Sequence, residues 1–294
     1  MPRLLSHALL MITALIWGVT FVFQTTGMDQ GLGPFGFTAF RFLAGSIALL
    51  PLAIWEARAT PLKPLLVSSG PGDYRKIMIG TLALGVLMFC GSALQQVSLG
   101  ITSVANTAFL TTLYVPMVPL FGLVLFARNI RGLRWLAVGI CMVGSWLMSG
   151  ASPMEAVIGD IMVVIGAVFW AAHIMIVGAM VQRSKTPFQL AFLQTFITMV
   201  LSFVVLPFLE TFTMAQVMAV LPEILFAGVM STAVGFTLQL VAQQHCSDAA
   251  AAIILSLEGA IAAIAGWVLL DQTMMTSAII GAALIFMAIL LVEL

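Results

Sequence analysis

Ten stretches of about 20 apolar residues follow one another along this chain of 294 residues, with only short polar or proline-containing connections between them. A helix of about 20 residues crosses the hydrocarbon core of a bilayer. The first stretch is too long and its start too weakly charged for a cleaved signal peptide. We therefore expect an all-α integral membrane protein with ten transmembrane helices, over residues 6–26, 34–55, 77–98, 102–126, 132–150, 157–181, 188–209, 220–243, 248–270 and 275–293.

The composition excludes a soluble protein, because 62% of the residues are hydrophobic and only 7% are charged. Soluble domains are about one-quarter charged. The formal net charge is zero, so no nucleic-acid partner is indicated. Cys90, Cys141 and Cys246 stand singly in or at the end of apolar stretches, which is typical of small buried hydrophobic residues rather than of a metal or redox site.

The basic residues fall on one side of the predicted membrane protein. If the helices alternate in direction, ten of the eleven lysines and arginines lie on the side of both termini, while the opposite side has none and has acidic residues such as Asp29 and Glu155. The positive-inside rule then places both termini in the cytoplasm. The ten basic residues are Arg3, Arg58, Lys63, Arg75, Lys76, Arg128, Arg131, Arg134, Arg183 and Lys185.

The two halves of the chain resemble each other. The segment 12–24 has the pattern of 165–177, so that Trp17 matches Trp170, 153 residues later. The segment 103–113 matches 247–257, 144 residues later. Since five helices are an odd number, the second copy enters the membrane from the opposite side. We expect two inverted five-helix repeats, residues 1–150 and 151–294, an architecture typical of secondary transporters with a site near the membrane midplane.

Several motifs also resemble a known family. The first half contains I-W-G-x-x-F over residues 16–21, P-F-x-F-x-A-F-R-F over 34–42, L-Y-V-P over 113–116 and W-x-x-x-G-x-x-x-x-G over 135–144. The second half repeats the plan, with L-E-G over 257–259 where the family commonly has L-E-P. These features are similar to the EamA-type unit of the drug/metabolite transporter superfamily, particularly its exporters of aromatic and other amino acids.

The resemblance implies a ten-helix carrier of a bacterial-type inner membrane that exports amino acids or similar small metabolites, without a cofactor. Two departures concern local contacts. Arg128 and Gln272 stand where family members often have Glu, and Gly259 replaces the proline of L-E-P. Exporters of an unrelated metabolite or of a drug belong to the same superfamily, so these cargoes stay open.

Polar residues inside membrane helices are costly and by default face protein or a watery cavity. Those that share a helical face, or recur in both halves, are our candidates for binding the cargo, although helix-to-helix hydrogen bonding would also explain single Ser and Thr residues. The candidates are Trp17, Thr20, Gln24, Met88, Ser92, Gln95, Thr111, Tyr114, Trp170, His173, Gln239 and Gln243.

Three ionisable residues are candidates for ion coupling or ion pairing. Glu258 lies about ten residues from either end of its helix, so it either couples protons, recognises an amine, or is a neutral group bonded to a neighbouring helix. His173 is a second coupling candidate, or a buried hydrogen-bonding group. Arg41 either extends to the interface or pairs with Glu258 or with a cargo carboxylate.

Other classes of membrane protein fit less well. An enzyme would need a catalytic constellation such as HExxH or a Ser–His pair within the membrane, and none is present, nor is there a P-loop for ATP hydrolysis. A channel or facilitator would favour a charged ring or repeated filter and an oligomer. Two halves in one chain favour a carrier that works by alternating access in the lipid bilayer and can work as a monomer.

Overall fold

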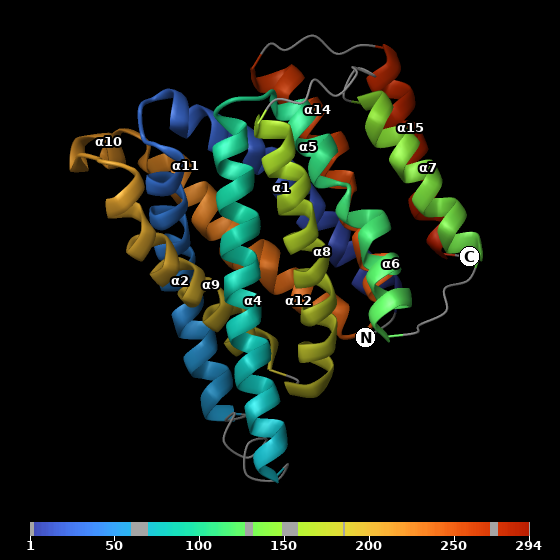
Figure 1. The fold of residues 1–294 in the computed structure, drawn as a ribbon, viewed down its shortest axis with the longest axis horizontal. Coiled ribbons are helices and arrows are strands. Elements are labelled where there is room, and N and C mark those ends of the chain that lie inside the picture. Colours follow the sequence, from blue (N-terminus) through green and yellow to red (C-terminus); the bar gives the residue numbers. More distant parts are fainter. Residues whose placement is uncertain are drawn as a thin grey trace.

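The computed structural model describes residues 3–59, 70–126, 132–148, 158–184, 186–270 and 276–293, and within these ranges every regular element is a helix. The helices run side by side in one elongated bundle (Figure 1). Within the described ranges, eight helical segments are long and apolar enough to cross a membrane, and two shorter apolar helices cover residues 132–147 and 279–291. The chain is thus a multi-pass membrane protein by length and composition, while the count of ten spans stays a prediction.

The helices of the first 150 residues are α1 (Arg3–Asp29), α2 (Pro34–Ala59), α4 (Gly70–Leu99), α5 (Val104–Thr111), α6 (Tyr114–Phe126) and α7 (Gly132–Met148). Those of the remainder are α8 (Ile158–Ser184), α9 (Pro187–Leu209), α10 (Met214–Ala219), α11 (Leu221–Leu225), the π-helix η1 (Phe226–Gly235), α12 (Phe236–Gln243), α13 (Asp248–Leu255), α14 (Leu257–Leu269) and α15 (Thr276–Glu293). The short α10 was not expected from the sequence, whereas α11, η1 and α12 together occupy the predicted span 220–243.

Two predicted spans are interrupted near their middle. The span 102–126 divides into α5 and α6 at residues 112–113, and the span 248–270 divides into α13 and α14 at Ser256. The first break lies about one turn before Pro116. Pro116 has no N–H to offer the carbonyl of Thr112, which instead accepts from Val115 N at 2.9 Å.

The hydroxyl groups at the two breaks make equivalent bonds. Thr112 Oγ1 donates to the carbonyl of Phe109 at 2.7 Å, and Ser256 Oγ donates to the carbonyl of Ile253 at 2.6 Å. Such bonds compete with the helical pattern and bend helices. Discontinuous helices of this kind commonly form the binding sites of transporters.

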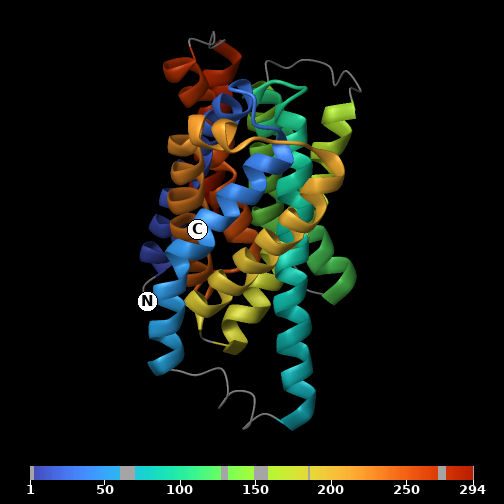
Figure 2. The same ribbon diagram turned by 90° about the vertical axis from the view of Figure 1, so that its left-hand side faces the viewer.

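The helices α2 and α9 cap each other: a glutamate at the end of each helix accepts hydrogen bonds from backbone N–H groups at the start of the other. Glu210, directly after α9, accepts from the N–H groups of Phe35 and Gly36 at 2.9 Å each, at the start of α2. Glu56, near the end of α2, accepts from Gln189 N at 2.8 Å, at the start of α9. Carboxylates are favoured at helix N-termini. These bonds join the two helices, which face the viewer in Figure 2, at both ends.

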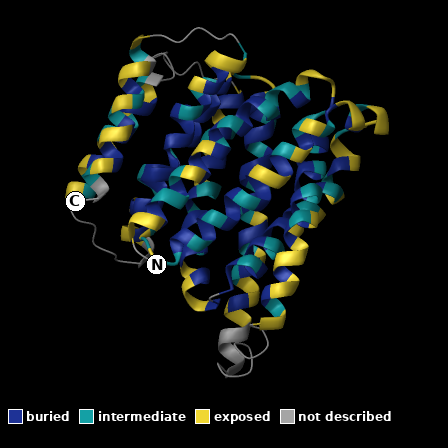
Figure 3. Ribbon diagram, turned by 180° about the vertical axis from the view of Figure 1, so that it is seen from behind, coloured by how far each residue is buried: buried dark blue, intermediate teal, exposed yellow. Residues whose placement is uncertain are grey.

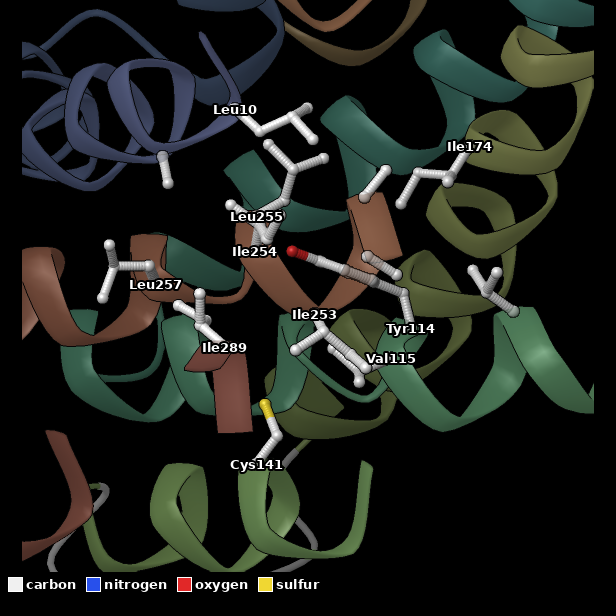
Figure 4. Close-up of a cluster of buried hydrophobic side chains, with 14 of the residues drawn as sticks. Leu10, Tyr114, Val115, Cys141, Ile174, Ile253, Ile254, Leu255, Leu257 and Ile289 are labelled. Carbon is white, nitrogen blue, oxygen red and sulfur yellow. The ribbon is translucent and has the colours of Figure 1, made fainter. Parts of the chain in front are cut away.

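Burial separates the inside of the bundle from its surface. Buried residues face the interior, whereas much of the outer surface is exposed and apolar (Figure 3). Large side chains such as Trp55, Val124 and Phe208 are 62%, 76% and 83% exposed, as expected of a lipid-facing surface. The main core lies where α1, α6, α8 and α13 meet, around Tyr114, Ile174 and Ile254 (Figure 4).

Several predictions fall outside the described residues. The middle of the predicted polar loop 56–76 lies there, and the structure extends α2 and α4 into its two ends. Arg128, Glu155 and Gln272 also lie outside the described residues, so the departure from the family pattern at Arg128 and Gln272 stays untested.

Candidate functional site

A pocket with a cavity volume of about 40 Å³ lies inside the bundle. Its lining side chains come from both halves of the chain and from nine helical elements, including the two interrupted spans and the π-helix. They are Trp17, Thr20, Phe21, Gln24, Arg41, Gln95, Thr111, Tyr114, Trp170, Ile174, Ser231, Phe236, Gln239 and Glu258.

One wall of the pocket is aromatic. The rings of Trp170 and Phe236 are nearly parallel, 16° apart with centroids 6.0 Å from each other, and Trp17 tilts against Phe236 at 4.8 Å. Trp17 Nε1 donates to the carbonyl of Ser231 at 3.1 Å, whereas Trp170 Nε1 has no partner among the described residues. This wall offers flat apolar surface for stacking.

The π-helix shapes this wall. In η1 the hydroxyl of Thr232 donates to the carbonyl of Ala227, five residues earlier, at 3.0 Å. Single π-helical turns are frequent at functional sites. In this chain the wide turns present the carbonyl of Ser231 to Trp17 and the hydroxyl of Thr232 to Arg41.

The pocket also contains one basic and one acidic side chain. Arg41 is 5% exposed and donates from Nε to Thr232 Oγ1 at 3.3 Å. Glu258 is 4% exposed and accepts from the hydroxyl of Tyr114 at 3.1 Å. Among the described residues neither forms an ion pair, with the other or elsewhere. Two buried ionisable groups without a counter-charge are energetically costly unless a ligand or water satisfies them.

These positions bear on the alternatives left open by the sequence. Arg41 does not extend to the membrane interface, because its side chain is buried and lines the pocket. Glu258 does bond to a neighbouring helix through Tyr114, yet it also lines the pocket. The ion pair between Arg41 and Glu258 considered above is absent from the described residues.

Amide side chains occupy the remaining polar wall. Gln95 donates to Thr111 Oγ1 at 3.1 Å, and Gln24 donates to Gln96 Oε1 at 2.5 Å. Gln239 donates to Gln243 Oε1 at 2.9 Å, while its own Oε1 has no partner among the described residues. The Gln239 carbonyl is therefore an unused acceptor on the pocket wall.

The structure brings together eight of the twelve predicted cargo-binding residues in this pocket: Trp17, Thr20, Gln24, Gln95, Thr111, Tyr114, Trp170 and Gln239. The other four lie beside it. Met88 belongs to the apolar core with Leu84 and Phe236, and Ser92 is buried. His173 bonds to Gln194 at 3.0 Å, and Gln243 donates to the carbonyl of Ile174 at 3.0 Å.

Sequence reasoning missed four lining residues. Phe21 lies one turn after Trp17 on the same face of α1, and Ile174 follows Phe21 by the same 153 residues that separate the two tryptophans. Both were therefore within reach of the repeat pattern. Ser231 and Phe236 enter the pocket through η1 and the start of α12, and no sequence signal predicted a π-helix there.

Contacts across the pocket join residues of the two halves of the chain. Glu258 follows Tyr114 by 144 residues, and these two side chains bond to each other. Trp17 packs against Gly235, where a Cβ would lie 2.5 Å from Trp17 Nε1. Trp170 packs in the same way against Gly91, 144 residues before Gly235. The tryptophan of each half thus packs against a glycine of the other half.

An all-helical, multi-pass membrane protein with an internal pocket of aromatic, amide and charged side chains has the features of a small-molecule transporter. Comparison with known proteins agrees. The model of the EamA-like transporter family matches residues 4–150 and 157–294, and the chain belongs to this family.

Relatives with the same general description are found in an archaeon. An uncharacterized transporter of Archaeoglobus fulgidus is 29% identical over 99% of this chain and 87% of its own length. Another uncharacterized transporter of that organism is 27% identical over 57% of this chain and 55% of its own length. A protein of known crystal structure aligns with a TM-score of 0.76 over 98% of this chain and 96% of its own, at 16% identity, which shows the shared fold.

Proposed function

We propose that this transporter is a secondary carrier that exports amino acids or closely related metabolites by alternating access. Its two halves, residues 1–150 and 151–294, act as inverted five-helix repeats in ten spans. The paired breaks at Thr112 and Ser256, the reciprocal caps of α2 and α9 and the crossed tryptophan–glycine contacts support this arrangement. The basic residues that gather in the connections on the side of both termini support cytoplasmic termini and insertion in an inner membrane.

The observation that carries the cargo assignment is a buried basic side chain and a buried acidic side chain in one pocket, neither of which forms an ion pair among the described residues. A free amino acid has a carboxylate and an ammonium group joined by one carbon. The guanidinium of Arg41 suits the carboxylate, because it offers several donors in a planar fork. Glu258, held by Tyr114, suits the ammonium. A zwitterion would thus satisfy both buried groups without adding net charge to the pocket.

The rest of the lining suits the side chain of such a cargo. Trp17, Trp170 and Phe236 supply stacking surface, which favours aromatic or other large apolar side chains. Gln95 and Gln239 provide amide groups that orient the polar end. Cargo binding and proton coupling both remain roles for Glu258, and the two roles predict different consequences of its substitution.

Counterflow in proteoliposomes tests the cargo assignment directly. Vesicles are preloaded with one amino acid, and exchange is measured for the free amino acid, its methyl ester and its N-acetyl derivative. We expect the free amino acid to exchange at least about tenfold better than either derivative, because each derivative leaves one buried charge unpaired. Equal exchange of all three, or exchange of an unrelated metabolite alone, would contradict an amino-acid cargo.

Substitutions of Arg41 and Glu258 test which group of the cargo each side chain binds. Arg41→Gln should raise the half-saturating concentration of the free amino acid about tenfold or more and abolish its advantage over the ester. The exposed Arg75 provides the matched control, since Arg75→Gln removes the same charge outside the pocket. Glu258→Gln should remove the advantage over the N-acetyl derivative if Glu258 binds the amine. A lost pH dependence with unchanged affinity would instead assign Glu258 to proton coupling.

A further inference from the structure

A compact polar cluster in the second half lies next to the pocket but does not open into it. Within the cluster, His173 and Gln194 are fully buried and are joined by a bond of 3.0 Å between Nε2 and Oε1. The imidazole ring lies nearly perpendicular to the indole of Trp170, with ring centroids 5.8 Å apart and an interplanar angle of 86°. Of these three side chains only Trp170 lines the pocket.

Each member of this cluster has a polar atom with no hydrogen-bond partner among the described residues. The three atoms are Trp170 Nε1, His173 Nδ1 and Gln194 Nε2. Buried polar groups in folded proteins are nearly always satisfied, and an unsatisfied one calls for an explanation. Three of them on adjoining side chains indicate a place where a polar ligand belongs in another state of the protein.

The sequence positions of the cluster relate it to the pocket. Trp170, His173 and Gln194 follow Trp17, Thr20 and Arg41 by 153 residues each. All three of those earlier residues line the pocket. In a carrier built from inverted repeats, a two-fold axis in the membrane plane relates the two halves. Exchanging the conformations of the two halves therefore converts one access state into the other. In the opposite state we therefore expect Trp170, His173 and Gln194 to have the surroundings that Trp17, Thr20 and Arg41 have in this structure.

We propose that Trp170, His173 and Gln194 form a second, neutral cargo site that holds the carboxylate end of the cargo in the opposite access state. This inference rests on the proposed transport function. Gln194 Nε2 and Trp170 Nε1 are the donors toward the carboxylate. The cargo meets a guanidinium on one side of the membrane and neutral donors on the other.

This difference in charge makes the second site the weaker one. Hydrogen bonds from a guanidinium to a carboxylate are about twice as strong as those from neutral donors. The carrier therefore binds an anionic group tightly in the state shown and releases it readily from the opposite state. Unequal affinities at the two membrane faces do not drive uphill transport. They set the cargo concentration at which the carrier is half-saturated at each face.

The test measures half-saturating concentrations separately at the two membrane faces, in right-side-out and in everted membrane vesicles. Gln194→Arg should lower the value about tenfold or more at one face only and slow net release from that face. Trp170→Phe, which keeps a ring but removes the Nε1 donor, should raise the value at that same face. Arg41→Gln should raise it at the other face. The control Gln182→Arg adds the same charge at an exposed position of α8.

The outcomes separate this inference from the choice of cargo. If counterflow identifies an anionic cargo other than an amino acid, the same vesicle measurements are made with that cargo. Effects of Gln194→Arg and Arg41→Gln at opposite faces support the second site. Equal effects of Gln194→Arg at both faces, an effect at the same face as Arg41→Gln, or no effect of either Gln194→Arg or Trp170→Phe would overturn it, whatever the cargo.

Discussion

Gly235 and Gly91 allow the two pocket tryptophans to lie directly against a neighbouring helix. A Cβ at Gly235 would lie 2.5 Å from Trp17 Nε1, and one at Gly91 would lie 2.9 Å from Trp170 Cε2. Both distances are shorter than a van der Waals contact. These glycines are therefore required by the close approach of an indole ring rather than by backbone conformation.

Substitution of Gly235 tests this packing. Gly235→Ala should displace Trp17, break its bond to Ser231 and lower the free energy of unfolding by about 1–3 kcal/mol. Thermal unfolding in detergent measures the loss, and Trp fluorescence reports the displaced ring. Gly139→Ala is the control, because no atom lies within 4 Å of a Cβ there and α7 gains helix propensity. Equal stability of the two variants would show that the glycine is not needed for packing.

Cys246, between α12 and α13 and outside the membrane-spanning segments, should be unreactive at neutral pH. Burial, assisted by the negative charge of Asp248, raises the pKa of its thiol to about 12. Only the thiolate reacts with maleimides, so the rate should rise with pH up to about 12. At pH 7 we expect labelling roughly 10³-fold slower than for the same cysteine in the unfolded chain. Rapid labelling of native Cys246 at pH 7 would contradict this environment.

At the scale of whole elements, the reciprocal glutamate caps join α2 and α9. Because each cap links the end of one helix to the start of the other, removing either should loosen the pair. Glu210→Ala leaves the N–H groups of Phe35 and Gly36 without their acceptors and should cost about 1–2 kcal/mol of stability. Asp29 is the exposed last residue of α1, and Asp29→Ala is the control, which should cost less than about 0.5 kcal/mol. Similar losses in both variants would argue against a specific cap.

Most of the helices were predictable, while their interruptions were not. Hydrophobic stretches of membrane length and the positions of Pro34 and Pro187 mark the helix starts in the sequence itself. The break at Thr112 depends on a hydroxyl that bonds to its own backbone and on the missing N–H of Pro116. The π-helix depends on contacts of η1 with α1 and α2, which no local pattern records.

At the scale of the whole molecule, the site was predictable where the two halves correspond. Trp17 and Trp170 occupy matching positions in the two halves, so the repeat pattern alone marks both as candidates, and both line the pocket. Arg41 was the hardest case, because an arginine near a helix end is typically explained by extension to the interface. Only the fold shows that α2 crosses η1 at Thr232 and turns this side chain inward.

The central claim is that one pocket between the halves opens to each side of the membrane in turn. A single cysteine at position 20, in a chain whose native cysteines are replaced by alanine, tests it most directly, since Thr20 lines the pocket. A membrane-impermeant maleimide should label Thr20→Cys from either face of sealed vesicles, and cargo should slow both reactions. Labelling from one face alone, with and without cargo, would contradict alternating access.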